Sequence, residues 1–314
     1  MIAHLTRRRF LTIAAAACAL PSAAAAAEVA PVYRWRGIAL GAPASMTLSG
    51  IEALDGARIA ARVEAEVVRL EAIFSLYRPA SALLRLNAEG RLEAPPPELL
   101  EVFGLCDALW YATGGVFDPT VQPLWALKAM AAREGRAPSA HELADARRRI
   151  GWRDVAWDER GVAFARPGMA MTLNGIAQGF VTDRIARLLH AEGLSGVLID
   201  MGEIAASGHR PDGSAWRAGI ADPQGRIVRE VRLGDRALAT SAPLGPQDGP
   251  GAHVFDPRTG GTASAWSLVS VSASSAMLAD GLSTALCLVE GKAQAFGVAG
   301  RFQDARIEVL ASAS

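Results

Sequence analysis

Apolar side chains recur at helical spacing along much of the chain. Between residues 52 and 74 they stand three or four positions apart, which places them on one face of an α-helix. These positions are Ile59, Val63, Val67, Leu70 and Phe74. The same reasoning predicts helices over about 98–112, 139–149 and 275–288, and one more directly after the glycine turn at 175–179. We therefore expect several amphipathic helices that each bury one stripe.

Shorter apolar runs predict the β-strands. Residues 31–50 have the pattern of an extended start, Met169–Leu173 is strand-like, and Gly196–Asp200 has the pattern of a buried strand. Other short strands are expected near residues 155–157, 162–165, 216–220, 229–233, 236–240 and 267–273. Helices and strands mix without a strict βαβ rhythm, so the expected fold class is α+β (mixed α/β). No linker divides two halves, which indicates one compact, two-lobed catalytic unit over residues 28–314.

The composition narrows the possible functions. Half of the 314 residues (51%) are hydrophobic, which excludes an intrinsically disordered or collagen-like chain. The 32 basic residues balance the 32 acidic ones, whereas a nucleic-acid-binding protein usually has a basic excess. Lys128 and Lys292 are the only lysines, so Schiff-base chemistry has just two candidate amines. The chain also lacks a solenoid-type repeat.

The first 27 residues have the pattern of an export signal. Thr6–Thr12 contains a twin-arginine pattern, an apolar run follows as far as Leu20, and Ala23–Ala27 offers small-residue cleavage sites. We therefore expect residues 1–27 to be a twin-arginine (Tat) signal peptide, and the mature protein to be periplasmic without a transmembrane segment. The alternatives are a basic, alanine-rich tail and an inner-membrane lipoprotein anchored at Cys18.

Two cysteines remain in the mature chain. Cys106 and Cys287 both lie within apolar helical patterns. Buried thiols are therefore expected at these positions, rather than a disulfide or a pair of metal ligands.

Asp280 and Thr284 form the first candidate site. They are four residues apart on the predicted helix 275–288, so a carboxylate and a hydroxyl point the same way, and Ser283 could add a third oxygen. Hard oxygen ligands suit Mg²⁺ or Ca²⁺ better than zinc. A pair on the helix surface is the alternative. The apolar neighbours favour a buried carboxylate, and a buried carboxylate needs a partner.

Four further segments are candidates for a ligand site. The Asn174–Gly179 turn lets the backbone approach a ligand and presents amides of a helix start to phosphate oxygens. His253 leads into a tight Asp-Pro-x-x-Gly turn, although a lone histidine is more often structural. Gly114–Thr120 is another glycine-led loop. In Phe74–Asn87, Tyr77 is either a ring that stacks on a planar ligand or a core aromatic. The dinucleotide fingerprint, the P-loop, H-E-x-x-H and G-x-S-x-G are absent.

Taken together and in this order, these segments resemble the ApbE family, the FAD:protein FMN transferases (flavin transferases). The matching stretches span nearly all of the mature chain. They are Phe74–Asn87, Gly114–Leu124, Leu173–Asp183, Gly208–Pro223, His253–Gly260 and Ala279–Thr284. The resemblance implies the flavin-transferase domain of that family, with FAD bound in a cleft as a substrate and Mg²⁺ as the metal.

The resemblance also implies roles for single residues. The metal would be held by the backbone carbonyl of Gly175 and by Asp280 and Thr284, with Ser283 nearby, in agreement with the oxygen pattern described above. His253 is the candidate general base, because the pKa of an imidazole lies near neutral. The implied flavin contacts are Leu40, Tyr77, Val116, Phe117, Asp118, Thr172, Gln178 and His253.

The implied reaction moves FMN from FAD to a threonine of a target protein through a phosphodiester bond and releases AMP. By the resemblance, the targets are subunits of membrane redox complexes. Several positions depart from the commoner pattern. Gln178 stands where many members have lysine, and Ala252 stands where many have a second histidine. Asp200-Met201-Gly202-Glu203 replaces the usual Asn-x-Gly-Gly-Asp, so Glu203 is a carboxylate moved or substituted. Asn174-Gly175 replaces a pair of glycines, Thr240-Ser241-Ala242 replaces Thr-Ser-Gly, and Leu40-Gly41-Ala42 only partly matches Met-Gly-Thr. An FAD pyrophosphatase and a non-catalytic periplasmic flavin carrier are the alternative functions.

Overall fold

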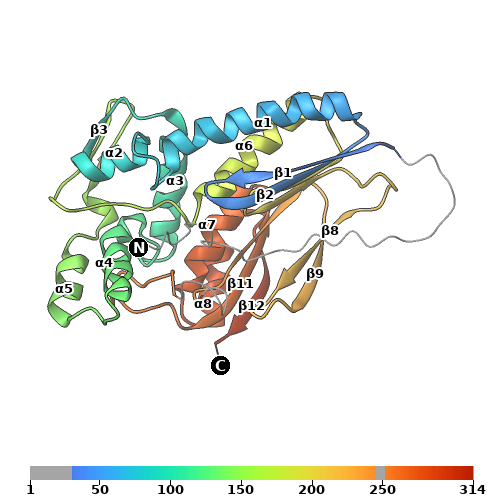
Figure 1. Cartoon of the computed structure of the whole chain (residues 1–314). Coiled ribbons are helices and arrows are strands. Elements are labelled where there is room, and N and C mark those ends of the chain that lie inside the picture. Colours follow the sequence, from blue (N-terminus) through green and yellow to red (C-terminus); the bar gives the residue numbers. More distant parts are fainter. Residues whose placement is uncertain (1–29, 245–251, 314) are drawn as a thin grey trace.

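The structure is a computed structural model that describes residues 30–244 and 252–313. The predicted signal peptide at 1–27, including Cys18, lies outside the described residues and stays a prediction. Figure 1 shows a broad sheet with helices packed against it on one side of the molecule, and a smaller group that includes α2, α4 and α5 on the other side.

The central sheet has seven strands in the order β1-β2-β6-β7-β10-β11-β12, and every neighbouring pair is antiparallel. The strands are Val32–Ala39 (β1), Ala42–Ser49 (β2), Val197–Asp200 (β6), Ile204–Ser207 (β7), Arg236–Ser241 (β10), Trp266–Ala273 (β11) and Arg306–Ser312 (β12). Leu40 and Gly41 connect β1 to β2 with φ values of 49° and 84°. Such left-handed conformations are what a two-residue hairpin turn requires.

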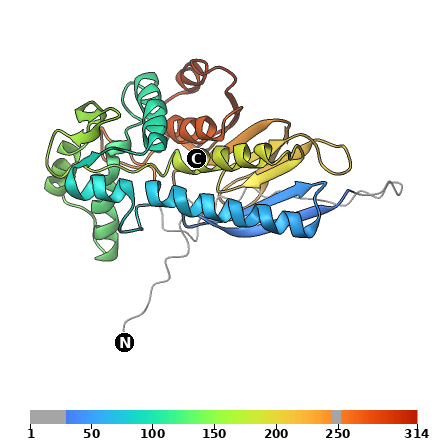
Figure 2. The same ribbon diagram turned by 90° about the horizontal axis from the view of Figure 1, so that it is seen from above.

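Three helices cover one face of this sheet. They are α1 (Ala53–Phe74), α6 (Ala177–Ala191) and α7 (Ala276–Cys287). The predicted apolar stripe of α1 is buried, and α7 packs against β10 and β11. Seen from above in Figure 2, α1 and α6 run side by side across the sheet.

A two-stranded hairpin covers the opposite face. It consists of β8 (Trp216–Ala221) and β9 (Ile227–Leu233). The alternation of side chains along β7 explains the two layers: Ala205 packs against α7, whereas its neighbour Ile204 packs against Trp216 of the hairpin.

The remaining elements form the smaller part of the molecule and its border with the sheet. The helices are α2 (Ala82–Glu89), α3 (Pro97–Ala112), α4 (Gln122–Arg133), α5 (Ala140–Arg148) and α8 (Lys292–Ala299). A three-stranded antiparallel sheet consists of Arg91–Glu93 (β3), Gly161–Phe164 (β5) and Val155–Trp157 (β4), and two 3₁₀ turns lie at Pro119–Val121 and Trp152–Asp154. Phe103 and Trp152 of this part belong to the same buried cluster as Met46 of the central sheet, so one core connects both.

Most predicted elements are confirmed to within a residue or two. The sequence identified α1, α3, α5, α6 and α7 but not α2, α4 or α8. The signals for α2 are local: Ser81 accepts a hydrogen bond from the Leu84 amide at 3.1 Å, and Gly90 ends the helix at φ 72°. Helices and strands alternate irregularly along the chain, which confirms the mixed α+β class.

The predicted strand at Met169–Leu173 is wrong. The segment has the expected alternation of buried and less buried residues, but it pairs with no strand. Instead, the Asn87 side chain accepts a hydrogen bond from the Met171 amide and donates one to the Met171 carbonyl, both at 2.8 Å. The Thr172 amide donates to the Pro119 carbonyl at 2.8 Å. A side-chain amide therefore takes the place of the neighbouring strand.

Cys106 and Cys287 are buried and unpaired, as predicted. Burial raises the pKa of both thiols. Over residues 30–244 and 252–313, none of the helices combines the length and the apolarity that crossing a membrane requires.

Candidate functional site

Gly179 lets the start of α6 touch the backbone of α7. A Cβ atom at residue 179 would lie 2.3 Å from the carbonyl oxygen of Ala276 and 2.7 Å from the Cα of Met277, so a larger residue would push the helices apart. At this contact the Gly179 amide donates a hydrogen bond of 3.0 Å to Oδ2 of Asp280. Asp280 is 3% exposed, which confirms the buried carboxylate expected from its apolar neighbours.

Hydroxyl groups of α7 and β10 meet one turn further along α7. The Oγ atoms of Ser283 and Ser241 lie 2.8 Å apart, and Thr284 Oγ1 lies 3.3 Å from the same Ser241 oxygen. A Cβ atom at Gly175 would lie 2.9 Å from Thr284 Oγ1, so the glycine turn touches the threonine. The structure thus places the four predicted metal-binding residues together, since Asp280 is one turn before Thr284 on α7.

Three carboxyl groups at or near this site lie in surroundings that disfavour their ionised forms. Burial raises the pKa of Asp280 to about 7; the Gly179 amide acts in the opposite direction, and the charge of Asp183 raises the pKa further. Burial raises the pKa of Glu203 well above its usual value, and the charges of Asp280 and Asp200 add to the effect. Burial also raises the pKa of Asp200. A cation placed among these groups would therefore stabilise their ionised forms.

The donors present fit a metal ion that prefers oxygen. Asp280, Ser283 and Thr284 offer carboxylate and hydroxyl oxygens, and the space beside Thr284 stays open because residue 175 has no side chain. Within the described ranges there is no cluster of three or more histidine, cysteine, aspartate or glutamate side chains that could hold a metal. A site here would therefore depend on hydroxyl and backbone oxygens beside one acid, which suits Mg²⁺ or Mn²⁺ better than metals that prefer nitrogen or sulfur.

Gln178, the second residue of α6, has a buried donor without a partner. The residue is 6% exposed, and its Nε2 has no hydrogen-bond acceptor in the structure. Gly202 lies directly against it, because a Cβ atom there would be 2.3 Å from Nε2. Buried amides nearly always have partners, so an acceptor atom of a bound ligand is a natural partner for this group.

The loop Gly114–Thr120 and the segment before Gly175 lie side by side, since the Thr172 amide donates to the Pro119 carbonyl. Val116 and Phe117 are 4% and 6% exposed and belong to the hydrophobic core. These two residues therefore expose little surface to a ligand in this structure.

Asp118 holds this loop in place. Its carboxylate accepts hydrogen bonds from the amide and the hydroxyl of Thr120, at 2.8 and 2.5 Å, and from the amide of Trp152 at 3.0 Å. Burial nevertheless raises the pKa of Asp118. The carboxylate is thus engaged in holding the loop.

Leu40 and Tyr77, two further predicted flavin contacts, lie near the C-terminal end of α1. Leu40 is in the β1–β2 turn, where its amide donates to Glu71 Oε1 of α1 at 3.0 Å. Tyr77 follows α1 and is 57% exposed, which excludes the alternative of a core aromatic. These two residues are therefore candidates for the ring-binding end of the site.

His253 is partly buried and is followed by the buried residues Val254 and Phe255, close to the segment that follows β10. Its amide donates to the Pro243 carbonyl at 3.0 Å. The turn that follows has the predicted form: Asp256 Oδ1 accepts from the Arg258 amide at 2.8 Å, and the Asp256 carbonyl accepts from the Gly260 amide at 2.8 Å. The catalytic role of His253 stays a prediction.

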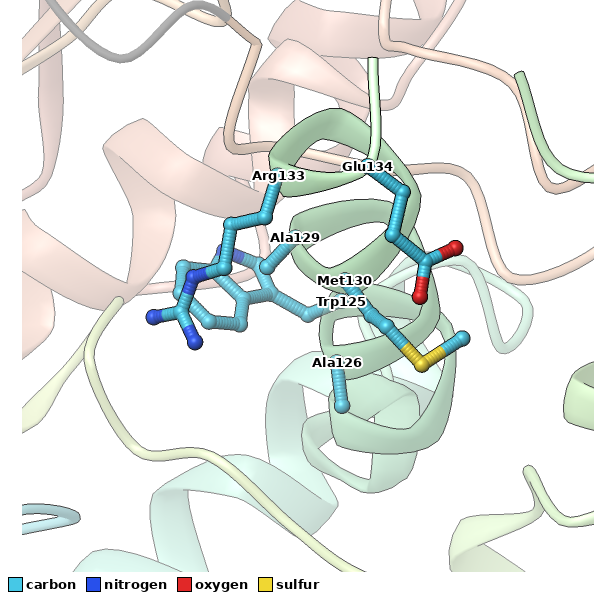
Figure 3. A pocket seen from close by; sticks show the side chains of 6 residues that line it. All are labelled: Trp125, Ala126, Ala129, Met130, Arg133 and Glu134. Atoms are coloured by element: carbon cyan, nitrogen blue, oxygen red, sulfur yellow. The ribbon is translucent and has the colours of Figure 1, made fainter. Parts of the chain in front are cut away.

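A surface hollow of about 330 Å³ lies on α4, apart from these residues. In Figure 3, Trp125 and Arg133 extend to one side of the helix, while Met130 and Glu134 extend to the other. None of the residues that line the hollow belongs to the predicted site.

The sequence analysis assigned no role to two residues that organise the site. Ser241 connects β10 to α7 through the hydroxyl contacts described above. Asp183 of α6 accepts hydrogen bonds from the Ser275 hydroxyl and from the amides of Ala276 and Met277, at 2.7, 2.7 and 3.0 Å, and so caps α7. Ser275 before an apolar run is a recognisable helix start, but nothing in the sequence marks Asp183 as its partner.

Comparison with known proteins extends these findings. The ApbE family model matches residues 40–310. A curated FAD:protein FMN transferase of Vibrio cholerae (serotype O1) is 34% identical over 239 residues, which cover 72% of this chain and 71% of the relative. One of Klebsiella pneumoniae is 27% identical over 262 residues, with coverage of 78% and 75%.

Solved structures agree with the fold. The apo form of the flavinyl transferase ApbE of Pseudomonas stutzeri is 26% identical, covers 90% of this chain and 94% of its own, and has a TM-score of 0.76. The ApbE protein of Thermotoga maritima is also 26% identical, covers 90% and 97%, and has a TM-score of 0.77. The arrangement of helices and strands described above is thus shared with known flavin transferases.

Proposed function

The chain belongs to the ApbE family, and from this premise we propose that it is an FAD:protein FMN transferase. The observation that carries the proposal is the contact between the Gly175–Gly179 turn and α7. This contact gathers an acid, two hydroxyls and an unpartnered buried amide at one place. Such a set of oxygen donors with a nearby N–H donor suits a metal-bound diphosphate.

The proposed reaction is a displacement at phosphorus. The hydroxyl oxygen of a threonine in a target protein forms a bond to the phosphorus on the FMN side of FAD. The bond between this phosphorus and the bridging oxygen of the diphosphate breaks, and AMP leaves with that oxygen. The hydroxyl proton passes to a base, and the target retains FMN through a phosphodiester.

Asp280, Ser283 and Thr284, together with the backbone carbonyl of Gly175, are the residues that would hold Mg²⁺. When bound, the ion would spread the negative charge that develops on the diphosphate in the transition state. Asp280 has to be ionised for this role, and a nearby divalent charge lowers a carboxyl pKa that is otherwise about 7.

The other roles fall to residues around this centre. Gln178 Nε2 would donate a hydrogen bond to a phosphate oxygen. The amides of Ile176 and Ala177 are not available for this role, because both donate to the Leu173 carbonyl, and the Gly179 amide donates to Asp280. Tyr77 would contact the flavin ring. His253 would accept the proton of the attacking hydroxyl, because imidazole titrates near neutral pH.

We further propose that the protein works in the periplasm after twin-arginine export, because residues 1–27 have the required order of arginines, apolar run and small residues. A threonine-bearing subunit of a membrane redox complex is the acceptor we propose.

The decisive test mixes the mature protein with FAD, Mg²⁺ and threonine-containing target peptides. Mass spectrometry should find FMN attached to the peptide, with AMP released in equal amount. Free FMN with AMP would instead identify an FAD pyrophosphatase, and intact FAD bound without Mg²⁺ would identify a flavin carrier.

Single substitutions then assign the roles. Asp280→Ala should abolish Mg²⁺-dependent AMP release; Asp145→Ala, on the surface of α5, is the control that should leave it unchanged. His253→Ala should still bind FAD but slow transfer by roughly 10²–10⁴-fold. An unchanged rate would remove the histidine from the chemistry.

A further inference from the structure

One carboxylate connects the Leu40 turn to the Tyr77 loop. Glu71 lies in the last turn of α1, and its two oxygens point to different segments. Oε1 accepts the 3.0 Å hydrogen bond from the Leu40 amide, and Oε2 pairs with Nη1 of Arg78 at 3.2 Å. Glu71 is thus a bridge between a hairpin of the sheet and the loop that follows α1.

The Tyr77 loop is held firmly although its tyrosine is exposed. Ser75 Oγ accepts hydrogen bonds from the amides of Tyr77 and Arg78, at 3.1 and 3.2 Å. Arg78 Nη1 also donates to the Val68 carbonyl of α1 at 3.0 Å. Ser81 closes the loop by donating to the Ser75 carbonyl at 2.5 Å. A fixed loop that exposes 57% of a tyrosine is typical of a binding surface.

The Leu40 turn shows the same combination of constraint and exposure. Leu40 has a φ of 49°, a left-handed conformation that is unfavourable for leucine and is retained where the surroundings impose it. The bond from its amide to Glu71 is one such constraint. Ile38, two residues earlier on β1, is 62% exposed, and Val68, one turn before Glu71 on α1, is 52% exposed. Apolar surface therefore stands beside both segments that Glu71 joins.

We propose that Glu71 is a positioning residue for the ring of the substrate. Together with Arg78, it sets the spacing between the Leu40 turn and the Tyr77 loop, so that a planar heteroaromatic ring can be held between them. This inference rests on the proposed function, which makes the isoalloxazine of FAD the natural occupant. The three fused rings of the flavin cover the exposed apolar side chains better than the smaller adenine does.

The chain offers a matched control for Glu71. Glu64 lies two turns earlier on α1, and it accepts a hydrogen bond of 2.8 Å from Trp35 Nε1 of β1. Both glutamates therefore attach the same hairpin to the same helix face, but only Glu71 also reaches the Tyr77 loop. A purely structural role predicts equal effects of Glu64→Gln and Glu71→Gln, whereas a positioning role predicts different ones.

The test compares Glu71→Gln with Glu64→Gln in the mature protein. In Glu71→Gln, the new side-chain amide nitrogen would face the Arg78 guanidinium, and both groups are donors. The contact between residue 71 and Arg78 should therefore be lost, while the bond from the Leu40 amide is kept. We expect the Kd for FMN, followed by flavin fluorescence, to rise about two- to fivefold, the change that corresponds to the modest energy of a partly exposed ion pair. The Kd for AMP, the melting temperature relative to Glu64→Gln, and kcat at saturating FAD should stay unchanged.

A second variant keeps the test independent of the folding of the first. Arg78→Met removes the guanidinium group that pairs with Glu71. The Arg78 side chain is 43% exposed, so the fold should tolerate the substitution. It should raise the Kd for FMN in the same way, and the double variant should be no weaker than the worse single one.

Two results would overturn the inference: equal effects of Glu64→Gln and Glu71→Gln on FMN binding, or a Glu71→Gln defect in AMP binding alone, which would place adenine between the segments. Failure of the proposed function would look different. In that case the wild-type protein would transfer no FMN, whereas the comparison of FMN binding between the two glutamate variants would still give its answer.

Discussion

Gly175→Ala tests the contribution of the glycine turn to metal binding while the fold is kept. Residue 175 does not have a left-handed backbone, so alanine fits its conformation. The three atoms nearest to the added Cβ all belong to the side chain of Thr284, at 2.8 Å for Cγ2, 2.9 Å for Oγ1 and 3.1 Å for Cβ. The substitution therefore acts on the proposed ligand Thr284, from a residue whose own carbonyl is another proposed ligand.

The expected magnitudes differ for stability and for metal binding. Over-packing lowers the free energy of unfolding by about 1–3 kcal/mol. Replacing glycine by alanine at a compatible position raises it by about 0.4–1 kcal/mol, because the unfolded chain loses conformational freedom. The net loss of about 0–3 kcal/mol corresponds to a fall in melting temperature of no more than about 6 °C for a chain of this size. To reach ordinary contact, the Thr284 oxygen must move by about 0.5 Å. Metal–ligand distances tolerate only about 0.2 Å, so Mg²⁺ affinity should fall at least tenfold.

The assay measures AMP release from FAD as a function of Mg²⁺ concentration. Gly175→Ala should shift the Mg²⁺ midpoint upward while the melting curve changes little. Adding Thr284→Ser removes the methyl group that the new Cβ meets first and keeps the hydroxyl, so the double variant should regain part of the lost affinity. A wild-type midpoint in Gly175→Ala would refute the placement of Thr284 at the metal.

Three further predictions concern the surroundings of this centre. The pKa of Asp280 is about 7 in the folded protein, instead of 3.8. Between these pH values the metal-free folded protein therefore holds a proton on Asp280 that the unfolded chain has lost. Its free energy of unfolding should fall by about 4 kcal/mol at most as the pH rises from about 4 to 7. Urea unfolding should show a steeper slope in the wild type than in Asp280→Asn, in which Glu203 and Asp200 still contribute, and Mg²⁺ should restore stability above pH 7. Gly202→Ala should abolish FAD binding and lower the melting temperature, because φ is 104° and the Cβ would lie 2.3 Å from Gln178 Nε2. Asn87→Ala should destabilise the fold by about 2–4 kcal/mol, since both backbone groups of Met171 lose their partner, and thermal unfolding measures this loss.

The sequence predicts the elements whose signal lies within the element itself. The stripe of α1 and the apolar surroundings of Asp280 both follow from periodicity, and both are found as expected. The i and i+4 spacing of Asp280 and Thr284 is sufficient to place two proposed ligands on one helix face. Local spacing is enough in these cases because the helix itself sets the geometry.

Other features depend on partners that are distant in sequence, and these escaped prediction. Met169–Leu173 has the alternation of a strand, yet its partner is the side chain of Asn87, and no local rule separates the two cases. Asp183 caps a helix that begins 92 residues later. Glu71 looks like an ordinary polar residue of an amphipathic helix until the hairpin and the loop are seen to meet at its carboxylate.

The distribution of arginine gives the strongest physical argument for a cation at the candidate site. On the surface, acids have basic partners: Arg69 lowers the pKa of Glu66, and Arg136 lowers the pKa of Glu142 to about 2. The charges that act on buried Glu203 are instead those of Asp280 and Asp200, which are acids themselves. Burying carboxylates beside one another is unfavourable unless positive charge compensates for it. A divalent ion held by Asp280, as in the proposed function, would supply such compensation.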